Sequence, residues 1–212
     1  MMEILIPAGK VSLPGTATLP GGAAGIVAFV HGSGSSRLSP RNRYVAEVLQ
    51  AHGIATLLFD LLTPQEDRNC ETRFDIDLLT ERLLAAIAWL ETSKEAKGME
   101  IGCFGASTGA AAALQAAARN PRIAAVVSRG GRPDLAGPQA LAAVRAPTLL
   151  IVGGRDDGVV DLNRQAHGLL RCEKKLEIVP GATHLFEEPG TLEQAATHAA
   201  RWFASHFRPA GT

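Results

Sequence analysis

Residues 99–118 read MEIGCFGASTGAAAALQAAA, in which a short apolar run meets an alanine-rich run through a G-x-S-x-G pentapeptide, Gly105-Ala106-Ser107-Thr108-Gly109. This order predicts a strand, a sharp turn and a helix, with Ser107 at the turn and its hydroxyl exposed above the sheet. Glycines two residues to either side of the serine remove Cβ atoms where strand and helix nearly touch. Because the pentapeptide is short, an ordinary glycine-rich loop that opens a helix remains the alternative to a nucleophile at Ser107.

Strands and helices are predicted to alternate along the rest of the chain. Besides the strand and helix that flank Ser107, strands are predicted at 3–7, 16–19, 25–30, 54–59, 123–127, 147–152 and 175–179, helices at 40–51, 75–91, 135–144, 162–170 and 191–207, and an irregular loop at 61–73. The first two strands form an edge hairpin in this scheme. The fold class is therefore α/β, with a mostly parallel, doubly wound sheet of about seven or eight strands, helices on both faces and no separate lid domain.

Length and composition limit the class of protein. The 212 residues suit one domain spanning 1–212, on the rough scale of about 150 residues per domain. Lysine and arginine equal aspartate and glutamate at 21 each, so no overall charge favours nucleic acid or an anionic membrane. The start of the chain lacks the pattern of a signal peptide, and Cys70, Cys103 and Cys172 fit no metal or redox spacing. We therefore expect a cytoplasmic protein that binds neither nucleic acid nor a membrane.

Three loops at predicted strand ends carry the residue types that serine hydrolysis requires. Ser107, Asp156 and His184 occur in the order nucleophile, acid, histidine, which is the chain order of α/β-hydrolase sheets. A serine hydroxyl is a poor nucleophile at neutral pH, so it needs a base within reach, and the base needs an anion that fixes its tautomer. Asp156 or the adjacent Asp157 could supply this anion. Asp161 is expected to cap the helix that follows.

The sequence resembles the α/β-hydrolase superfamily and, within it, the small dienelactone-hydrolase-like proteins. The segments that carry the resemblance are His31-Gly32-Ser33, the pentapeptide around Ser107, Val152-Gly153-Gly154-Arg155-Asp156 and Gly181-Ala182-Thr183-His184. The family pattern Gly-Gly-x-Asp favours Asp156 as the acid. Dienelactone hydrolases proper use a cysteine nucleophile, whereas the matching residue here is Ser107. The resemblance therefore implies an ordinary carboxylesterase, without their particular lactone substrate.

The resemblance also implies an oxyanion hole. Its donors would be the backbone amides of Ser33 and Thr108, aimed at charge that develops only in the tetrahedral intermediate. His31 is expected to brace this loop and to take no part in the chemistry. Further candidates for substrate contact are Gly32, Gly34 and, at the end of the loop predicted from residue 61, Phe74.

Two arginines are additional candidates for substrate binding. Arg129 and Arg132 leave a predicted strand end on the side of the proposed triad, so a guanidinium fork could hold a carboxylate of the substrate there. In the alternative, which the sequence leaves open, the arginines pair with Asp134 or Glu66 and hold a loop in place.

These observations predict a serine-dependent hydrolase that cleaves carboxylic esters through an acyl-enzyme at Ser107, without a cofactor or a metal. An open site on a small body suits short-chain or small cyclic esters better than long lipid chains. An acyltransferase, thioesterase or perhydrolase could use the same triad, and a catalytically silent binding protein is the alternative from another class. The expected partner is a small-molecule ester, and a homodimer remains open.

Overall fold

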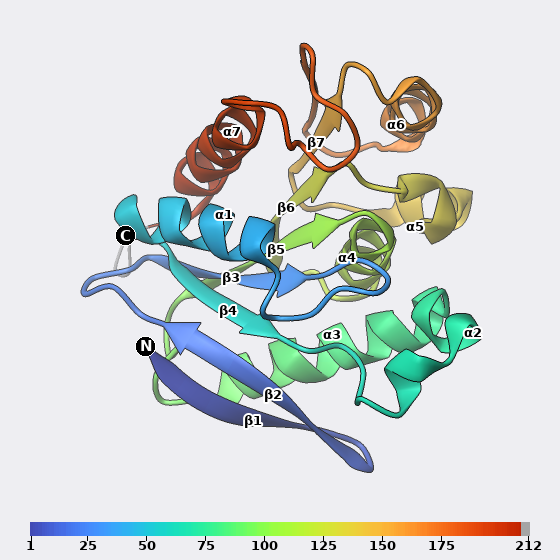
Figure 1. Ribbon diagram of the computed structural model, residues 1–212. Coiled ribbons are helices and arrows are strands. Elements are labelled where there is room, and N and C mark those ends of the chain that lie inside the picture. Colours follow the sequence, from blue (N-terminus) through green and yellow to red (C-terminus); the bar gives the residue numbers. More distant parts are fainter. Residues whose placement is uncertain (209–212) are drawn as a thin grey trace.

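The computed structural model describes residues 1–208, whose strands form a single eight-stranded sheet in the order β1-β2-β4-β3-β5-β6-β7-β8 (Figure 1). The strands are β1 (Met2–Ala8), β2 (Val11–Thr18), β3 (Gly25–Val30), β4 (Ala55–Phe59), β5 (Glu100–Ala106), β6 (Ile123–Arg129), β7 (Thr148–Gly153) and β8 (Lys174–Val179). The β1–β2 hairpin pairs antiparallel at one edge, β2 joins β4 antiparallel, and all other neighbours are parallel. The predicted mostly parallel sheet is confirmed.

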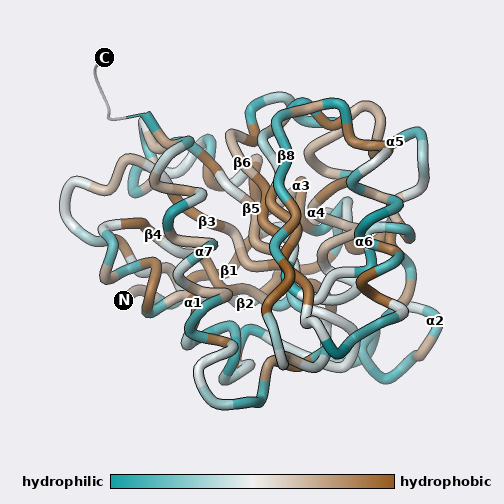
Figure 2. The backbone as a smooth tube through the Cα atoms, turned by 90° about the horizontal axis from the view of Figure 1, so that it is seen from above, coloured by the Kyte–Doolittle hydropathy of each residue, from teal (hydrophilic) through white to brown (hydrophobic). Residues whose placement is uncertain are grey.

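Helices cover both faces of this sheet. One face carries α1 (Pro40–Ala51) and α7 (Thr191–His206), and the other carries α3 (Ile76–Thr92), α4 (Thr108–Arg119), α5 (Pro138–Ala143) and α6 (Asp157–Leu169). Every residue of β3 is buried, and alternate side chains point to opposite faces. Val27 and Phe29 therefore pack towards α1 and α7, while Ile26, Ala28 and Val30 pack towards α3 and α4. In Figure 2 the central strands are accordingly brown, with teal segments concentrated towards the outside.

The loop after β4 was predicted to be irregular, and this prediction is wrong. It contains the short 3-10 helix η1 (Glu66–Arg68) and helix α2 (Cys70–Arg73). Thr63 and Glu66 satisfy each other's backbone amides, with the Thr63 N–H donating to Glu66 Oε2 at 2.8 Å and the Glu66 N–H donating to Thr63 Oγ1 at 3.3 Å. Asn69 Oδ1 then accepts the Glu71 N–H at 2.9 Å. The Thr-x-x-Glu spacing is a capping signal that was present in the sequence.

Two other helix predictions also need correction. The helix predicted at 135–144 is divided into η2 (Pro133–Ala136) and α5, because Gly137 adopts φ 84° and Pro138 follows it. Helix α6 begins at Asp157, five residues before its predicted start at 162. None of the helices within residues 1–208 combines the length and the hydrophobicity that a membrane crossing requires.

Parallel strands end at a common edge of the sheet, and this property assembles the site. The loops after β3, β5, β6, β7 and β8 all leave the sheet at the carboxyl ends of these strands. They carry Ser33, Ser107, Arg129, Asp156 and His184, respectively, at or just beyond each strand end.

Candidate active site

Ser107 occupies the sharp turn between β5 and α4. Its backbone has φ 51° and ψ −122°, a left-handed φ that is uncommon and strained for a residue with a side chain. A Cβ added at Gly105 would lie 2.5 Å from Ala110 Cα, and one added at Gly109 would lie 2.1 Å from the carbonyl oxygen of Val30. Both glycines are therefore required by the close approach of helix and strands. The predicted strand, turn and helix are present.

Asp156 and His184 form a hydrogen-bonded pair between the loops after β7 and β8. His184 Nδ1 lies 2.6 Å from Asp156 Oδ2, and the Asp156 side chain is only 18% exposed. Because an ionised carboxylate only accepts hydrogen bonds, Nδ1 of the neutral ring carries the proton and Nε2 is free to accept one. The Arg155 N–H donates to the Ala182 carbonyl at 2.9 Å, which holds the two loops together.

The neighbouring aspartates have other environments. Asp156 occupies the N-cap position of α6, but its side chain makes no capping bond and faces His184 instead. Asp157 is exposed and makes no side-chain hydrogen bond within residues 1–208. The prediction that Asp161 caps the helix is wrong, because α6 has already begun there and Asp161 pairs with Arg164 at 3.1 Å. Of the two candidate acids, Asp156 contacts the histidine.

A cavity of about 250 Å³ opens beside Ser107 at the carboxyl edge of the sheet. Five of the predicted site residues line it: Gly32, Ser33, Ser107, Arg129 and His184. Gly34, Phe74 and Arg132 do not line it, and the side chain of Phe74 lies 53% exposed. A larger hollow of about 750 Å³ lies at the amino ends of β5 and β6 and contains none of the predicted site residues.

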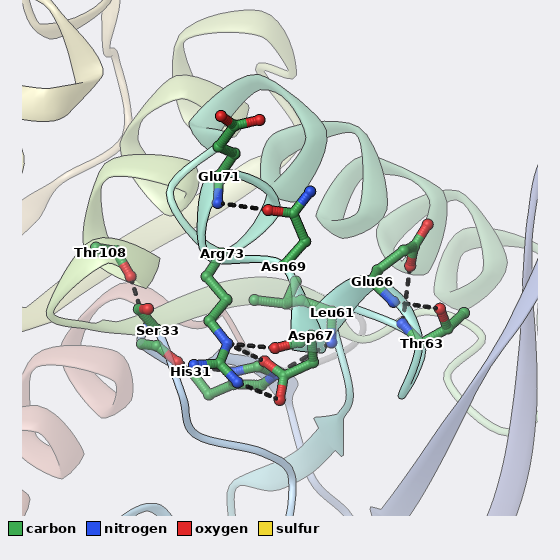
Figure 3. Close-up of polar contacts among 11 residues, drawn as sticks. His31, Ser33, Leu61, Thr63, Glu66, Asp67, Asn69, Glu71, Arg73 and Thr108 are labelled. Carbon is green, nitrogen blue, oxygen red and sulfur yellow. Dashed lines mark hydrogen bonds and ion pairs between the residues drawn. The ribbon is translucent and has the colours of Figure 1, made fainter.

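The loop after β3 is hydrogen-bonded to the serine turn. A Cβ at Gly32 would lie 3.0 Å from Ser107 Cβ, so a larger residue here would push this loop away from Ser107. The Ser33 N–H donates to Thr108 Oγ1 at 2.9 Å (Figure 3). The Ser33 amide, which the sequence predicts as an oxyanion donor, is therefore bonded to Thr108 in this structure. A hydroxyl that accepts this bond keeps its own proton to donate, so Thr108 places a second donor group beside its own backbone amide.

His31 joins the same loop to the loop after β4. The ring is buried; its Nδ1 lies 3.0 Å from the Gly32 carbonyl and its Nε2 accepts the Leu61 N–H at 3.0 Å (Figure 3). Because Nε2 must be unprotonated to accept this bond, the ring is neutral with its proton on Nδ1. Burial lowers the pKa of His31 below its ordinary value of 6.5. This geometry matches the bracing role expected of His31.

Acidification is expected to destabilise the fold through His31. Below pH 6.5 the unfolded chain protonates this histidine while the folded chain, with its lowered pKa, does not, so stability falls by up to about 1.4 kcal/mol per pH unit. Thermal unfolding between pH 7.5 and 5 measures the effect. His31→Asn should reduce the dependence on pH, whereas the exposed control His52→Gln should retain it. Equal pH dependence in the wild type and His31→Asn would contradict this account.

Arg73 of helix α2 contacts the loop after β3. Arg73 Nε bonds to the carbonyl of Asp67 and lies 3.1 Å from Asp67 Oδ1 (Figure 3). The Arg73 guanidinium also lies close to Gly34, because a Cβ there would be 3.9 Å from Arg73 Nη1. Helix α2 is therefore packed against the loop after β3, and Phe74, which follows α2, does not line the cavity.

Arg132 makes the structural pairing that the sequence left open. Its Nη2 lies 2.8 Å from Asp134 Oδ2 and its Nε lies 2.9 Å from Oδ1, and the hydrogen bonds to Asp134 raise the pKa of Arg132. Glu66, the other candidate partner, pairs with Arg82 at 2.7 Å. Arg132 is thus engaged at the surface and away from the cavity.

Arg129 has a different environment. It is 6% exposed, lines the cavity and lies 5.6 Å from the ring centroid of Phe186. Burial, with a smaller contribution from the charge of Arg41, lowers the pKa of Arg129 to about 10, so the guanidinium remains charged at neutral pH. Of the two arginines singled out in the sequence, only Arg129 faces the candidate site.

Two residues that shape the loop carrying His184 were missed in the sequence. Phe186 is buried with φ 56°, which turns the chain immediately after the histidine. Glu188 Oε2 accepts the Thr183 N–H at 3.0 Å, and this bond lowers the pKa of Glu188. No local sequence pattern predicts a phenylalanine with a left-handed backbone conformation, so only the folded loop shows it.

Comparisons with known proteins show which family the chain belongs to. The model of the dienelactone hydrolase family matches residues 37–210. The chain belongs to the dienelactone hydrolase family. A dienelactone hydrolase structure from Anabaena variabilis has 53% identity and a TM-score of 0.94, and the match covers 98% of both chains. Membership of this family supports hydrolase activity.

More distant and longer proteins also match. Est1E from Butyrivibrio proteoclasticus shares the fold with a TM-score of 0.82 at 16% identity, over 96% of this chain and 98% of Est1E. Two Mycobacterium tuberculosis proteins, provisionally named phosphoribosyl transferases, are 58% identical over 206 residues. This match covers 96% of the chain but 46% of each relative, so the chain spans about half the length of these curated relatives.

Proposed function

We propose that the chain hydrolyses carboxylic esters through an acyl-enzyme at Ser107. The observation that carries this proposal is that the strained Ser107 and the Asp156-bound His184 line one cavity. Unprotonated Nε2 of His184 would take the Ser107 proton as Oγ bonds to the ester carbonyl carbon. Return of that proton to the departing alkoxide breaks the ester bond. Water activated by His184 then releases the acid and restores the serine.

The oxyanion of the tetrahedral intermediate would form beside the amino end of α4. The Thr108 backbone N–H follows the nucleophile directly and is the first donor. The second donor is the Thr108 hydroxyl, which accepts the Ser33 N–H at 2.9 Å. Alternatively, this hydroxyl rotates away and the Ser33 amide donates to the oxyanion directly. Either arrangement concentrates donors where charge develops, and the loss of one such donor typically costs about 100- to 1,000-fold in rate.

The name of the mycobacterial relatives does not carry over to this chain. It describes proteins of which the matched segment is less than half, and phosphoribosyl transfer has no counterpart in the geometry described above. The serine, histidine and aspartate instead support acyl transfer to water. The same acyl-enzyme could pass to an alcohol, a thiol or peroxide, and product analysis with these acceptors in competition with water distinguishes hydrolysis from such transfer.

Short acyl chains are expected to be the better substrates. The 250 Å³ cavity is lined largely by serines, Arg41, Asn42 and Arg129, with Leu185 as its one large apolar side chain. A long chain would therefore remain in water and lose the roughly 0.8 kcal/mol that each buried methylene contributes in an apolar groove. We expect kcat/KM for p-nitrophenyl esters to be highest for the acetate or butyrate. For the laurate, kcat/KM should be at least about tenfold lower. Comparable values at all chain lengths would contradict this expectation.

A further inference from the structure

Arg129 places a buried cation in the cavity wall without an anionic partner. It ends β6, is 6% exposed, and its Nε has no hydrogen-bond partner. None of the ion pairs within residues 1–208 includes Arg129. Native proteins pair buried charges, because an unpaired charge in a low-dielectric interior is strongly unfavourable. The unpaired guanidinium therefore indicates an anion that arrives from outside the chain.

A second source of positive charge faces the same cavity. Ser39, the N-cap residue of α1, and Arg41 and Asn42 in its first turn line this cavity together with Arg129. The amino end of a twelve-residue helix carries a partial positive charge and is suited to anions. Arg41 also contacts Glu187 at 3.4 Å, but both side chains are exposed, by 36% and 64%, and such pairs are weak in water. A ligand anion could therefore replace Glu187 on Arg41.

Uncharged polar groups complete this part of the wall. Asn42 is 2% exposed and lines the same part of the cavity. The hydroxyls of Ser35 and Ser39 add donors beside the two guanidinium groups. This part of the wall is thus polar and suited to a charged, oxygen-rich group.

We propose that the ester substrate carries a phosphate monoester group, held between Arg129 and Arg41 beside the carbonyl that Ser107 attacks. This inference rests on the proposed function. Two guanidinium groups and a helix amino end match the charge of about −1.5 to −2 on a phosphate monoester, whereas a carboxylate brings a single charge and two oxygens. Three terminal phosphate oxygens also accept from both guanidinium forks at once. The substrate class is therefore a phosphorylated carboxylic ester.

Calorimetric binding to the Ser107→Ala protein tests this site without requiring turnover. Three probes share one ring: phenyl phosphate, benzoate and benzamide. We expect phenyl phosphate to bind about tenfold or more tightly than benzoate, and benzamide most weakly. Adding Arg129→Met or Arg41→Gln should lower the affinity for phenyl phosphate about 10- to 100-fold, because hydrogen bonds to a charged group are lost. The control Arg43→Gln, on the exposed side of α1, should leave its affinity unchanged.

Each outcome supports or overturns the assignment. If benzoate binds as tightly as phenyl phosphate, the assignment of a phosphate group to the substrate is overturned. If benzamide binds equally well, the proposal of an anion site is overturned altogether. If thermal unfolding shows that Arg129→Met does not fold, the surface variant Arg41→Gln decides. Absence of ester hydrolysis in the wild-type protein would overturn the proposed function alone, because the binding series reports on the anion site separately.

Discussion

Replacing Ser107 with alanine is expected to lower kcat for a short-chain ester by about 10⁴- to 10⁶-fold. The substitution removes the oxygen that forms the acyl-enzyme, so the remaining rate reflects only substrate binding and oxyanion stabilisation. Alanine lacks only the hydroxyl, and no hydrogen bond of the Ser107 side chain supports the fold within residues 1–208. Steady-state kinetics with p-nitrophenyl acetate and a thermal unfolding curve would therefore separate loss of chemistry from loss of structure.

Ser35→Ala is the matched control for this experiment. Ser35 lines the same cavity on the wall proposed to hold an anion and lies outside the pentapeptide turn, so its loss should leave turnover of a neutral ester within about tenfold of the wild type. If Ser107→Ala retained activity comparable to that of Ser35→Ala, the nucleophile would lie elsewhere.

The second large effect is expected at Asp156. Replacing it with asparagine keeps the shape of the side chain but removes the anion that accepts the His184 Nδ1 proton at 2.6 Å. The asparagine amide would favour the tautomer with its proton on Nε2, which cannot accept the proton of Ser107. The expected loss in kcat is about 10⁴-fold, as for the equivalent change in a Ser-His-Asp triad. Rates near pH 7 measure it directly.

Asp157→Asn provides the comparison that assigns the acid. This neighbouring carboxylate is exposed in the first turn of α6 and does not contact His184. Its substitution should change kcat by less than about twofold. An Asp157 variant that loses as much activity as Asp156→Asn would transfer the role to Asp157 and contradict the geometry.

Much of this fold follows from local sequence signals. The apolar runs at β3 and β7 predict strands buried on both faces, and the G-x-S-x-G pentapeptide predicts the sharp turn at Ser107. Once the strands are parallel, their carboxyl ends must share an edge, so residues 28 or more positions apart, such as Asp156 and His184, can be expected to meet. The order of the three residues along the chain and the shared carboxyl edge of the strands were sufficient to predict the candidate site.

The contacts that refine the site depend on how loops pack, which no local pattern records. The Ser33 N–H and the Thr108 hydroxyl are 75 residues apart in sequence, and their bond follows from the close fit of Gly32 against Ser107. Arg129 and Arg132 were indistinguishable in the sequence, because only the fold shows that Asp134 pairs with Arg132 and leaves Arg129 unpaired. The capping pair Thr63 and Glu66, in contrast, was readable and was overlooked.

The most direct test of the central claim is covalent labelling of the wild-type protein with a fluorophosphonate, followed by mass spectrometry of the intact chain and of its peptides. A nucleophilic serine paired with an unprotonated histidine displaces fluoride and forms a stable adduct. We predict one adduct per chain, located on Ser107 and absent from the Ser107→Ala protein. Failure of the folded wild-type protein to react, or an adduct on any other residue, would contradict the account.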